Sequence, residues 1–170
     1  MDRPSLLNRL GALALALHDR QARAVALGAG LSPSRAAALV SVGAAPGLGV
    51  GELAAIVGVT QPVATRLLAD LERDGLLRRE REGRAVRLAL TPEGAALRDR
   101  VLALRAEEAG TALALAERDA PAGAAPLLAL VDALLAALTS DAAAGDRICR
   151  LCDEAACGLG ECPVERACRR

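Results

Sequence analysis

The chain has no phenylalanine, tyrosine, tryptophan or lysine, although 53% of its 170 residues are hydrophobic. Its core must therefore be built from leucine, valine and alanine packed through helices. Without aromatic rings the protein cannot hold single-stranded nucleic acid by stacking bases on them. Every basic residue is arginine, and 21 arginines balance 21 acidic residues. Any surface for a polyanion must therefore be a local patch.

Long apolar runs and early cysteines are also missing. No uninterrupted apolar stretch is long enough to span a membrane, and the Leu/Ala run at 10–17 lacks the cleavage site of a signal peptide. We therefore expect a cytoplasmic protein with no membrane partner. The five cysteines all lie at or after Cys149. Because cytoplasmic thiols stay reduced, this pattern argues against a structural disulfide.

Long helices are expected near both ends of the first 140 residues, because leucines recur there at three- and four-residue steps. These helices cover 4–29, 92–118 and 126–139. After the first of them, Ser32 and Pro33 are typical of an N-cap and a first helical residue, so a shorter helix begins there. The Gly- and Pro-rich stretch 44–51 predicts a loop.

The segment 52–75 has the pattern of a helix-turn-helix. Leu53 would face inward from a short helix, Gly58 marks a tight turn, and Thr60 caps a second helix. One face of that second helix is apolar. It consists of Ala64, Leu67, Leu68 and Leu71. The Asp-Gly pair at 74–75 then ends the helix.

Beyond this motif the pattern changes to alternation, with Val86, Leu88 and Leu90 on one side of a strand. It predicts a β-hairpin with its tip at Glu82-Gly83-Arg84. The stretch 78–87 contains five arginines and two acids. We expect the first two of these arginines, at 78 and 79, to be solvated strand residues. Thr91-Pro92-Glu93 predicts the start of the next helix.

This order of elements resembles the MarR family of winged helix-turn-helix transcription regulators. The resemblance covers roughly residues 5–140 and is most specific in ELAAIVGVTQPVATRLLADLERDGLLRRE and EGRAVRLALTPEG. It implies a mainly α (α+β) fold and a homodimer that binds a near-palindromic operator in double-stranded DNA, commonly as a repressor. The family often binds a small acidic or phenolic ligand between its dimerisation helices and its winged lobe, so a small-molecule effector is expected too.

The expected organisation is a winged helix domain followed by a small Cys-rich tail. The boundaries are 1–140 for the domain, about 31–91 for its DNA-binding lobe, about 4–29 and 92–139 for its dimerisation helices, and 141–170 for the tail. The sequence SDAAAGD is expected to link the last helix to the cysteines.

A recognition helix lies in the major groove and reaches the bases with its N-terminal residues. Opposite the apolar face, this helix carries Gln61, Pro62, Thr65 and Arg66. Glutamine can pair with adenine and arginine with guanine, while threonine can meet a thymine methyl group or a phosphate. In the hairpin, Arg81 and Arg84 are expected to enter the minor groove or bind phosphates. Ser32 and Arg35 are further phosphate candidates.

The tail carries the spacing C-x2-C-x4-C-x4-C, formed by Cys149, Cys152, Cys157 and Cys162. This spacing matches that of a zinc knuckle in which Cys157 replaces histidine, and four thiolates suit tetrahedral zinc. An iron–sulfur cluster is the alternative, and a metal-free thiol switch near several arginines is a third reading. Cys168 is spare in any four-ligand scheme, so it is either a resolving thiol or idle. We expect the tail to fold on a metal, because it has few apolar residues of its own.

The function expected from the sequence is therefore that of a dimeric DNA-binding regulator. A protein-interaction adaptor that uses a winged helix without DNA is an alternative, and so is a regulator that senses redox state through iron–sulfur or thiol chemistry. We do not expect an enzyme, because no histidine, serine or acid pair is arranged as a base. His18, the only histidine, is expected to be an ordinary helix residue.

Overall fold

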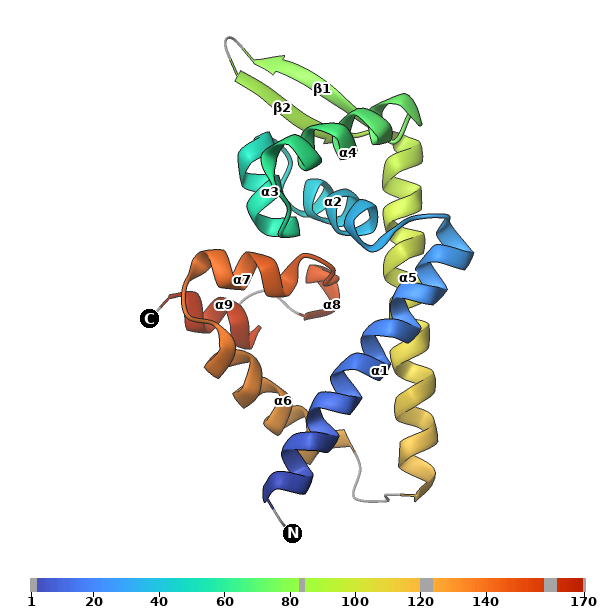
Figure 1. Cartoon of the computed structure of the whole chain (residues 1–170), viewed down its shortest axis with the longest axis vertical. Coiled ribbons are helices and arrows are strands. Elements are labelled where there is room, and N and C mark those ends of the chain that lie inside the picture. The colour runs from blue at the N-terminus through green and yellow to red at the C-terminus, as the bar shows by residue number, and fades with distance from the viewer. Residues whose placement is uncertain (1–2, 83–84, 120–123, 158–161, 170) are drawn as a thin grey trace.

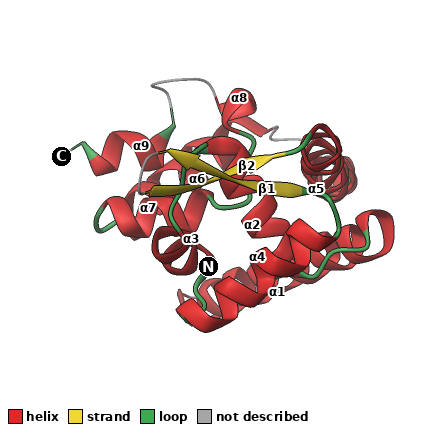
Figure 2. Cartoon of the chain, turned by 90° about the horizontal axis from the view of Figure 1, so that it is seen from above, coloured by secondary structure: helices red, strands yellow, loops and turns green. Residues whose placement is uncertain are grey.

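Helices make up most of the described residues, and the two strands found there form an antiparallel sheet at one end of the molecule (Figures 1 and 2). The computed structural model describes residues 3–82, 85–119, 124–157 and 162–169. In chain order the elements are α1 (Arg3–Ala29), α2 (Pro33–Ala44), α3 (Val50–Val57), α4 (Gln61–Arg73), β1 (Leu77–Glu82), β2 (Ala85–Leu90), α5 (Pro92–Asp119), α6 (Ala124–Leu138), α7 (Ala142–Cys149), α8 (Glu154–Cys157) and α9 (Pro163–Cys168). The mainly α (α+β) winged helix fold is confirmed, and the three long helices match their expected bounds within two residues.

Two clusters of buried residues hold the first part of the chain together. One cluster joins α2, α3, α4 and the hairpin into a winged lobe, and contains Ala38, Val42, Leu53, Leu67, Leu68, Leu71, Leu77 and Leu88. The other joins α1, α2 and α5, and contains Val25, Leu31, Ala36, Leu39, Val40, Val101 and Leu104. Because α2 contributes to both clusters, the position of the winged lobe relative to the long helices is fixed by apolar packing.

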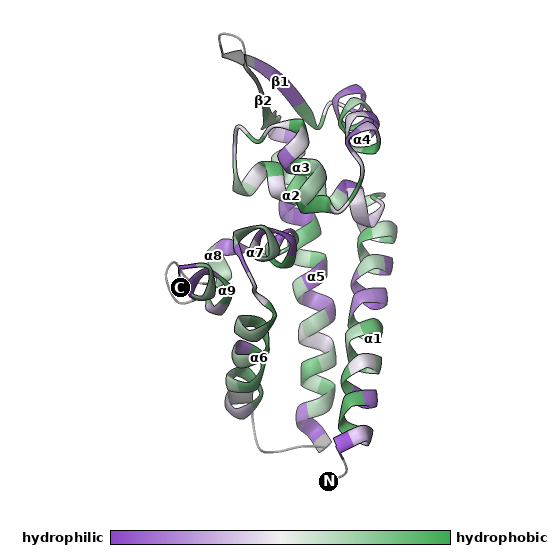
Figure 3. Ribbon diagram, turned by 60° about the vertical axis from the view of Figure 1, so that its left-hand side comes forward, coloured by the Kyte–Doolittle hydropathy of each residue, from purple (hydrophilic) through white to green (hydrophobic). Residues whose placement is uncertain are grey.

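Helices α1 and α5 lie side by side, as Figures 1 and 3 show. The side-chain amide of Gln21 donates a hydrogen bond to the carbonyl oxygen of Arg105 at 3.2 Å. Arg20 also forms an ion pair with Glu108 at 2.7 Å. These polar contacts therefore help to fix the register of two helices that also meet in the buried cluster around Val25 and Val101.

The hairpin has the alternation that the sequence predicts. Strands β1 and β2 are antiparallel, with Leu77 opposite Leu90 and Glu82 opposite Ala85. Leu88 is fully buried and Arg87 is exposed. The expected tip at 83–84 lies outside the described residues. The N–H of Gly47 donates to the carbonyl oxygen of Leu88 at 3.1 Å, which ties the hairpin to the loop before α3.

Helix α5 begins in tight contact with the end of the helix-turn-helix. The hydroxyl of Thr91 donates to the carbonyl oxygen of Gly75 at 2.6 Å and accepts from the N–H of Gly94 at 3.0 Å. Gly94 is buried, and a Cβ added there would overlap the backbone carbonyl of Leu76. Only glycine therefore lets α5 approach the turn that leads into the hairpin.

One prediction about the tail was wrong. The expected linker is largely helical, because α7 starts at Ala142 and Asp141 caps it by accepting from the N–H of Ala144 at 2.7 Å. This hydrogen bond lowers the pKa of Asp141. A run of three alanines after an aspartate is a good helix start. Helix α7 packs against α3, and α9 packs against α6 and α7, so the tail rests on the remainder of the chain.

No single helix in the described ranges is both long and apolar enough to cross a membrane. Helices α1 and α2 meet the length and hydropathy requirement only as a pair, bent by 81°.

Candidate nucleic-acid interface and cysteine pocket

The recognition helix predicted from the sequence is α4, and it turns one face outward at the end of the molecule that also carries the hairpin (Figure 1). Its inward face, predicted correctly, is buried and consists of Ala64, Leu67, Leu68 and Leu71. Its outward face consists of the four predicted residues, Gln61, Pro62, Thr65 and Arg66, all of which are exposed. The apolar period of the helix thus decides which of its polar side chains can reach a partner.

Two of the outward side chains have distinct hydrogen-bonding states. Thr65 donates its hydroxyl to the carbonyl oxygen of Gln61 at 2.9 Å. It cannot give the same proton to a phosphate, so its methyl group is the part best placed to meet a base. Arg66 has no hydrogen-bond or ion-pair partner in the described part of the chain, so its guanidinium is available for an acceptor.

Val63 is an exposed residue of α4 that the sequence reasoning missed. Its side chain is 45% exposed although valine usually lies in a core. It stands on the same first turns as Gln61 and Pro62. Its signal in the sequence was its position one residue before the buried Ala64, which places it outside the apolar face. An exposed aliphatic group there can contact the methyl group of thymine.

The structure shows the hairpin arginines only in part. Arg81 belongs to β1 and stands opposite Val86, but its side chain lies outside the described residues, as does all of Arg84. Arg78 pairs with Glu80 at 2.7 Å, and Arg79 pairs with Glu72 of α4 at 3.2 Å. The pair with Glu72 connects the first strand to the recognition helix.

The two further phosphate candidates have internal partners. Ser32 caps α2 by accepting from the backbone N–H of Arg35 at 3.4 Å. The guanidinium of Arg35 forms an ion pair with Asp74, which follows the last residue of α4. The Nε atom of Arg35 is buried and has no hydrogen-bond partner among the residues that the structure describes. This ion pair connects the start of α2 to the end of the recognition helix. The guanidinium of Arg35 is therefore already paired with a carboxylate of the protein itself.

The ion pair predicts how stability depends on pH. The hydrogen bond from Arg35 lowers the pKa of the Asp74 carboxyl group below its ordinary value. Because the folded pKa is the lower one, the stabilisation is present above the unfolded pKa, about 4, and is lost as the pH falls through the folded pKa. We expect Asp74→Asn to be less stable than wild type in urea at pH 7, with the difference shrinking at pH 3. A difference that is the same at both pH values would contradict this role.

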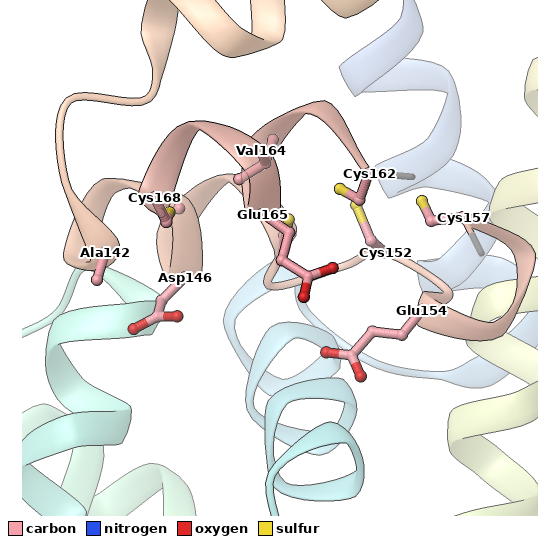
Figure 4. Close-up of a pocket in the computed structure, with 11 residues that line it drawn as sticks. Ala142, Asp146, Cys152, Glu154, Cys157, Cys162, Val164, Glu165 and Cys168 are labelled. Atoms are coloured by element: carbon pink, nitrogen blue, oxygen red, sulfur yellow. The ribbon is translucent and has the colours of Figure 1, made fainter. Parts of the chain in front are cut away.

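The five cysteines of the tail line one cavity of about 360 Å³ (Figure 4). Its other lining residues are Ala142, Gly145, Asp146, Glu154, Val164 and Glu165. All five thiols are free. In Figure 4, Cys152, Cys157 and Cys162 lie near one another, while Cys168 lies toward the other end. In the described ranges, no three His, Cys, Asp or Glu side chains are already arranged as a metal-ligand set.

The thiols nevertheless affect one another. A hydrogen bond between Cys149 and Cys152 raises the pKa of Cys149, and burial raises it further. The same bond lowers the pKa of Cys152 to about 7, and the positive charge of Arg105 adds to this effect while burial opposes it. Burial raises the pKa of Cys157, and so do the neighbouring thiols of Cys152 and Cys162. The thiolate therefore forms most easily at Cys152.

Cys168 has a different environment. Its sulfur lies so close to α7 that a Cβ on Gly145 would be 2.7 Å away, and it makes a long contact of 3.7 Å with the carbonyl oxygen of Asp141. Cys168 therefore packs α9 against α7.

A second cavity, of about 610 Å³, lies between α2, α5 and the start of the tail helices. Arg98 and Leu102 of α5, Val40 of α2 and the segment 152–156 contribute to its lining. The guanidinium of Arg98 is held by the carboxylate of Asp99 at 2.7 Å. Cys152 borders both cavities, so the tail forms a wall of each. His18 is exposed on α1, away from both linings.

The comparisons with known proteins agree with this geometry. Residues 29–87, which hold most of the winged lobe, match the model of the MarR family. A Mycobacterium tuberculosis MarR family protein, solved in complex with DNA, is 26% identical with a TM-score of 0.59 and covers 82% of this chain and 99% of its own. The same protein with salicylic acid is 27% identical with a TM-score of 0.58, covering 81% of this chain and 96% of its own.

A third solved structure has a fold similar to that of this chain. MepR, a transcription regulator of the Staphylococcus aureus multidrug efflux pump MepA, has a TM-score of 0.64 at 18% identity, and the match covers 79% of this chain and 99% of MepR. No curated protein sequence matches the chain significantly. Residues 29–87 thus match the MarR family, and the fold of the chain is that of solved MarR family transcription regulators.

Proposed function

We propose that this protein is a homodimeric transcription repressor that binds a near-palindromic operator and releases it in response to a small ligand. The observation that carries the DNA-binding part is the outward face of α4, where exposed polar side chains and one unpaired arginine stand beside the hairpin at one end of the molecule. A helix of this kind fits the major groove with its first turns toward the bases. Because the partner is DNA, the cytoplasm stays our prediction for its location.

Replacing Arg66 by alanine tests this proposal. We expect operator affinity to fall by about 5- to 150-fold, the equivalent of about 1–3 kcal/mol for a good base contact. Fluorescence anisotropy with a labelled duplex measures the change. Arg100→Ala removes an equally charged, exposed side chain from α5 and serves as the matched control. An equal loss in both variants, or none in Arg66→Ala, would favour the alternative of an adaptor that does not use DNA.

Apolar surface on the long helices supports the homodimer. The exposed large hydrophobic residues include Leu6, Leu7, Leu10, Leu13 and Leu15 of α1, Leu113 and Leu115 of α5, and Leu127, Leu128, Leu130, Val131 and Leu138 of α6. Figure 3 shows hydrophobic residues along α1 and α6. A single chain leaves these side chains in water, and a two-fold partner would cover them. The same symmetry would present two α4 helices to two half-sites.

The cavity beside Arg98 is our candidate for the effector site. It lies between the long helix α5 and α2 of the winged lobe, and Arg98, which pairs with Asp99, would exchange this partner for the carboxylate of an acidic ligand. A related family protein binds salicylic acid, which suggests an aromatic carboxylate as the first compound to try. We expect sodium salicylate to raise the thermal unfolding temperature of wild type more than that of Arg98→Ala. If sodium salicylate raised the unfolding temperature of wild type no more than neutral benzyl alcohol does, this assignment would be contradicted.

A further inference from the structure

The tail has an element that the DNA-binding function does not use, namely four thiols brought together from four points of the chain. Cys149 ends α7, Cys152 lies in the turn after it, Cys157 ends α8, and Cys162 precedes α9. All four border the cavity of about 360 Å³. We propose that these four thiolates bind one zinc ion, which locks the tail helices to each other and to the winged lobe.

The thiols meet as two pairs. The side chains of Cys149 and Cys152 share a hydrogen bond, and so do those of Cys157 and Cys162. Two thiolates on one tetrahedral zinc lie about 3.8 Å apart, since each Zn–S bond is about 2.3 Å long. Both pairs line the same cavity, so the four thiols lie around one space. Closing one pair on the other completes a four-thiolate shell.

Ligand preference favours zinc. Four thiolates complete a closed tetrahedral zinc shell, and zinc binds thiolates more tightly than ferrous iron does. A two-iron cluster also takes two cysteines on each iron, so the metal analysis below distinguishes the two groups.

Cys168 is the fifth thiol in the same cavity, and the geometry assigns it a packing role. Its sulfur lies against Gly145 and makes its long contact with the carbonyl oxygen of Asp141. Figure 4 places it toward the end of the cavity away from Cys157 and Cys162. Cys168→Ser is therefore a matched control for the four ligands.

The ion would connect the tail to the remainder of the protein through Leu151. This residue stands between two ligands, and its carbonyl oxygen accepts a hydrogen bond from Nε of Arg105 at 3.2 Å. Its side chain also packs against the cluster that joins α1, α2 and α5. Helix α7, which supplies Cys149, packs against α3 of the helix-turn-helix. Holding Cys149 and Cys152 on one ion therefore holds the tail against both α5 and the winged lobe.

The test is metal analysis of the full-length protein, purified without air and without added metal. We expect one zinc per chain, no iron, no sulfide and a colourless solution. Exchange with cobalt should give the visible and near-ultraviolet bands of a tetrahedral four-thiolate site, with one cobalt bound per chain. Iron with sulfide and a brown colour would overturn the zinc assignment. Protein that contains no metal and binds neither added zinc nor added cobalt would overturn the site.

Variants then identify the ligands. Cys152→Ser and, in case that variant does not fold, the exposed Cys157→Ser are expected to retain less than about a tenth of the wild-type zinc after dialysis, since each leaves only three thiolates. Cys168→Ser is expected to keep one zinc per chain. Equal zinc loss in all three variants would overturn the ligand set. This readout does not depend on DNA binding, so it can fail or succeed separately from the proposed function.

Discussion

Replacing Gly94 by alanine is expected to lower the free energy of unfolding by about 3 kcal/mol or more, at the upper end of the usual cost of overpacking. A methyl group at this position overlaps the backbone carbonyl of Leu76. A flexible side chain could move aside, but a backbone carbonyl cannot move without shifting the turn that joins α4 to β1. The hydrogen bonds that join Thr91 to Gly75 and Gly94 would be lost with that shift. Urea unfolding followed by circular dichroism at 222 nm measures the effect.

The matched control lies in the same helix. Gly110 of α5 is exposed, and a Cβ added there meets nothing within 4 Å. Gly110→Ala is expected to stabilise the protein by about 0.5–1 kcal/mol, because glycine is less favourable than alanine in a helix interior by that amount. If both substitutions changed the free energy of unfolding in the same direction, the contact with Leu76 would not be the reason that position 94 requires glycine.

The second large effect is expected from Leu128→Glu in α6. Leu128 is 62% exposed in the single chain, and we propose that a second copy covers it. A carboxylate in that interface would have to be buried without a partner, which costs far more than the leucine contact contributes. We expect the variant to be monomeric by light scattering. Operator affinity should fall by about 100-fold or more, because a monomer contacts only one half-site.

Leu27→Glu is the control for this experiment. Leu27 is 77% exposed near the end of α1, outside the cluster of exposed leucines on the first half of that helix and on α6. The same charge there should leave both the dimer and the operator affinity unchanged. A Leu128→Glu variant that remains dimeric would place the interface elsewhere on the molecule.

Local patterns made the winged lobe predictable. The buried face of α4 follows a helical period over four residues, so the opposite face, with Gln61 and Arg66, follows from the same count. The turns around it depend on neighbouring residues as well: Gly58 ends α3 with a positive φ of 75°, and Thr60 occupies the N-cap position of α4. Each signal involves residues within one turn of one another, and short-range rules describe such signals well.

Contacts between distant segments were not predictable. Arg105 meets Leu151 across 46 residues, and no sequence pattern marks that hydrogen bond. The ion pair between Arg35 and Asp74 joins residues 39 apart, which is why Arg35 could be considered for phosphate binding from the sequence alone. The start of α7 has a local signal, an N-cap aspartate before three alanines, but small residues with a glycine are typical of a linker too.

The measurement that tests the central claim most directly is selection of duplexes by the full-length protein from a random double-stranded library. We expect enrichment of a near-palindromic sequence with half-sites centred about one helical turn apart. Affinity for that sequence should fall steeply as salt rises, because phosphate contacts release counterions. A library that shows no enrichment after repeated rounds at low and moderate salt would contradict the account of this protein as an operator-binding regulator.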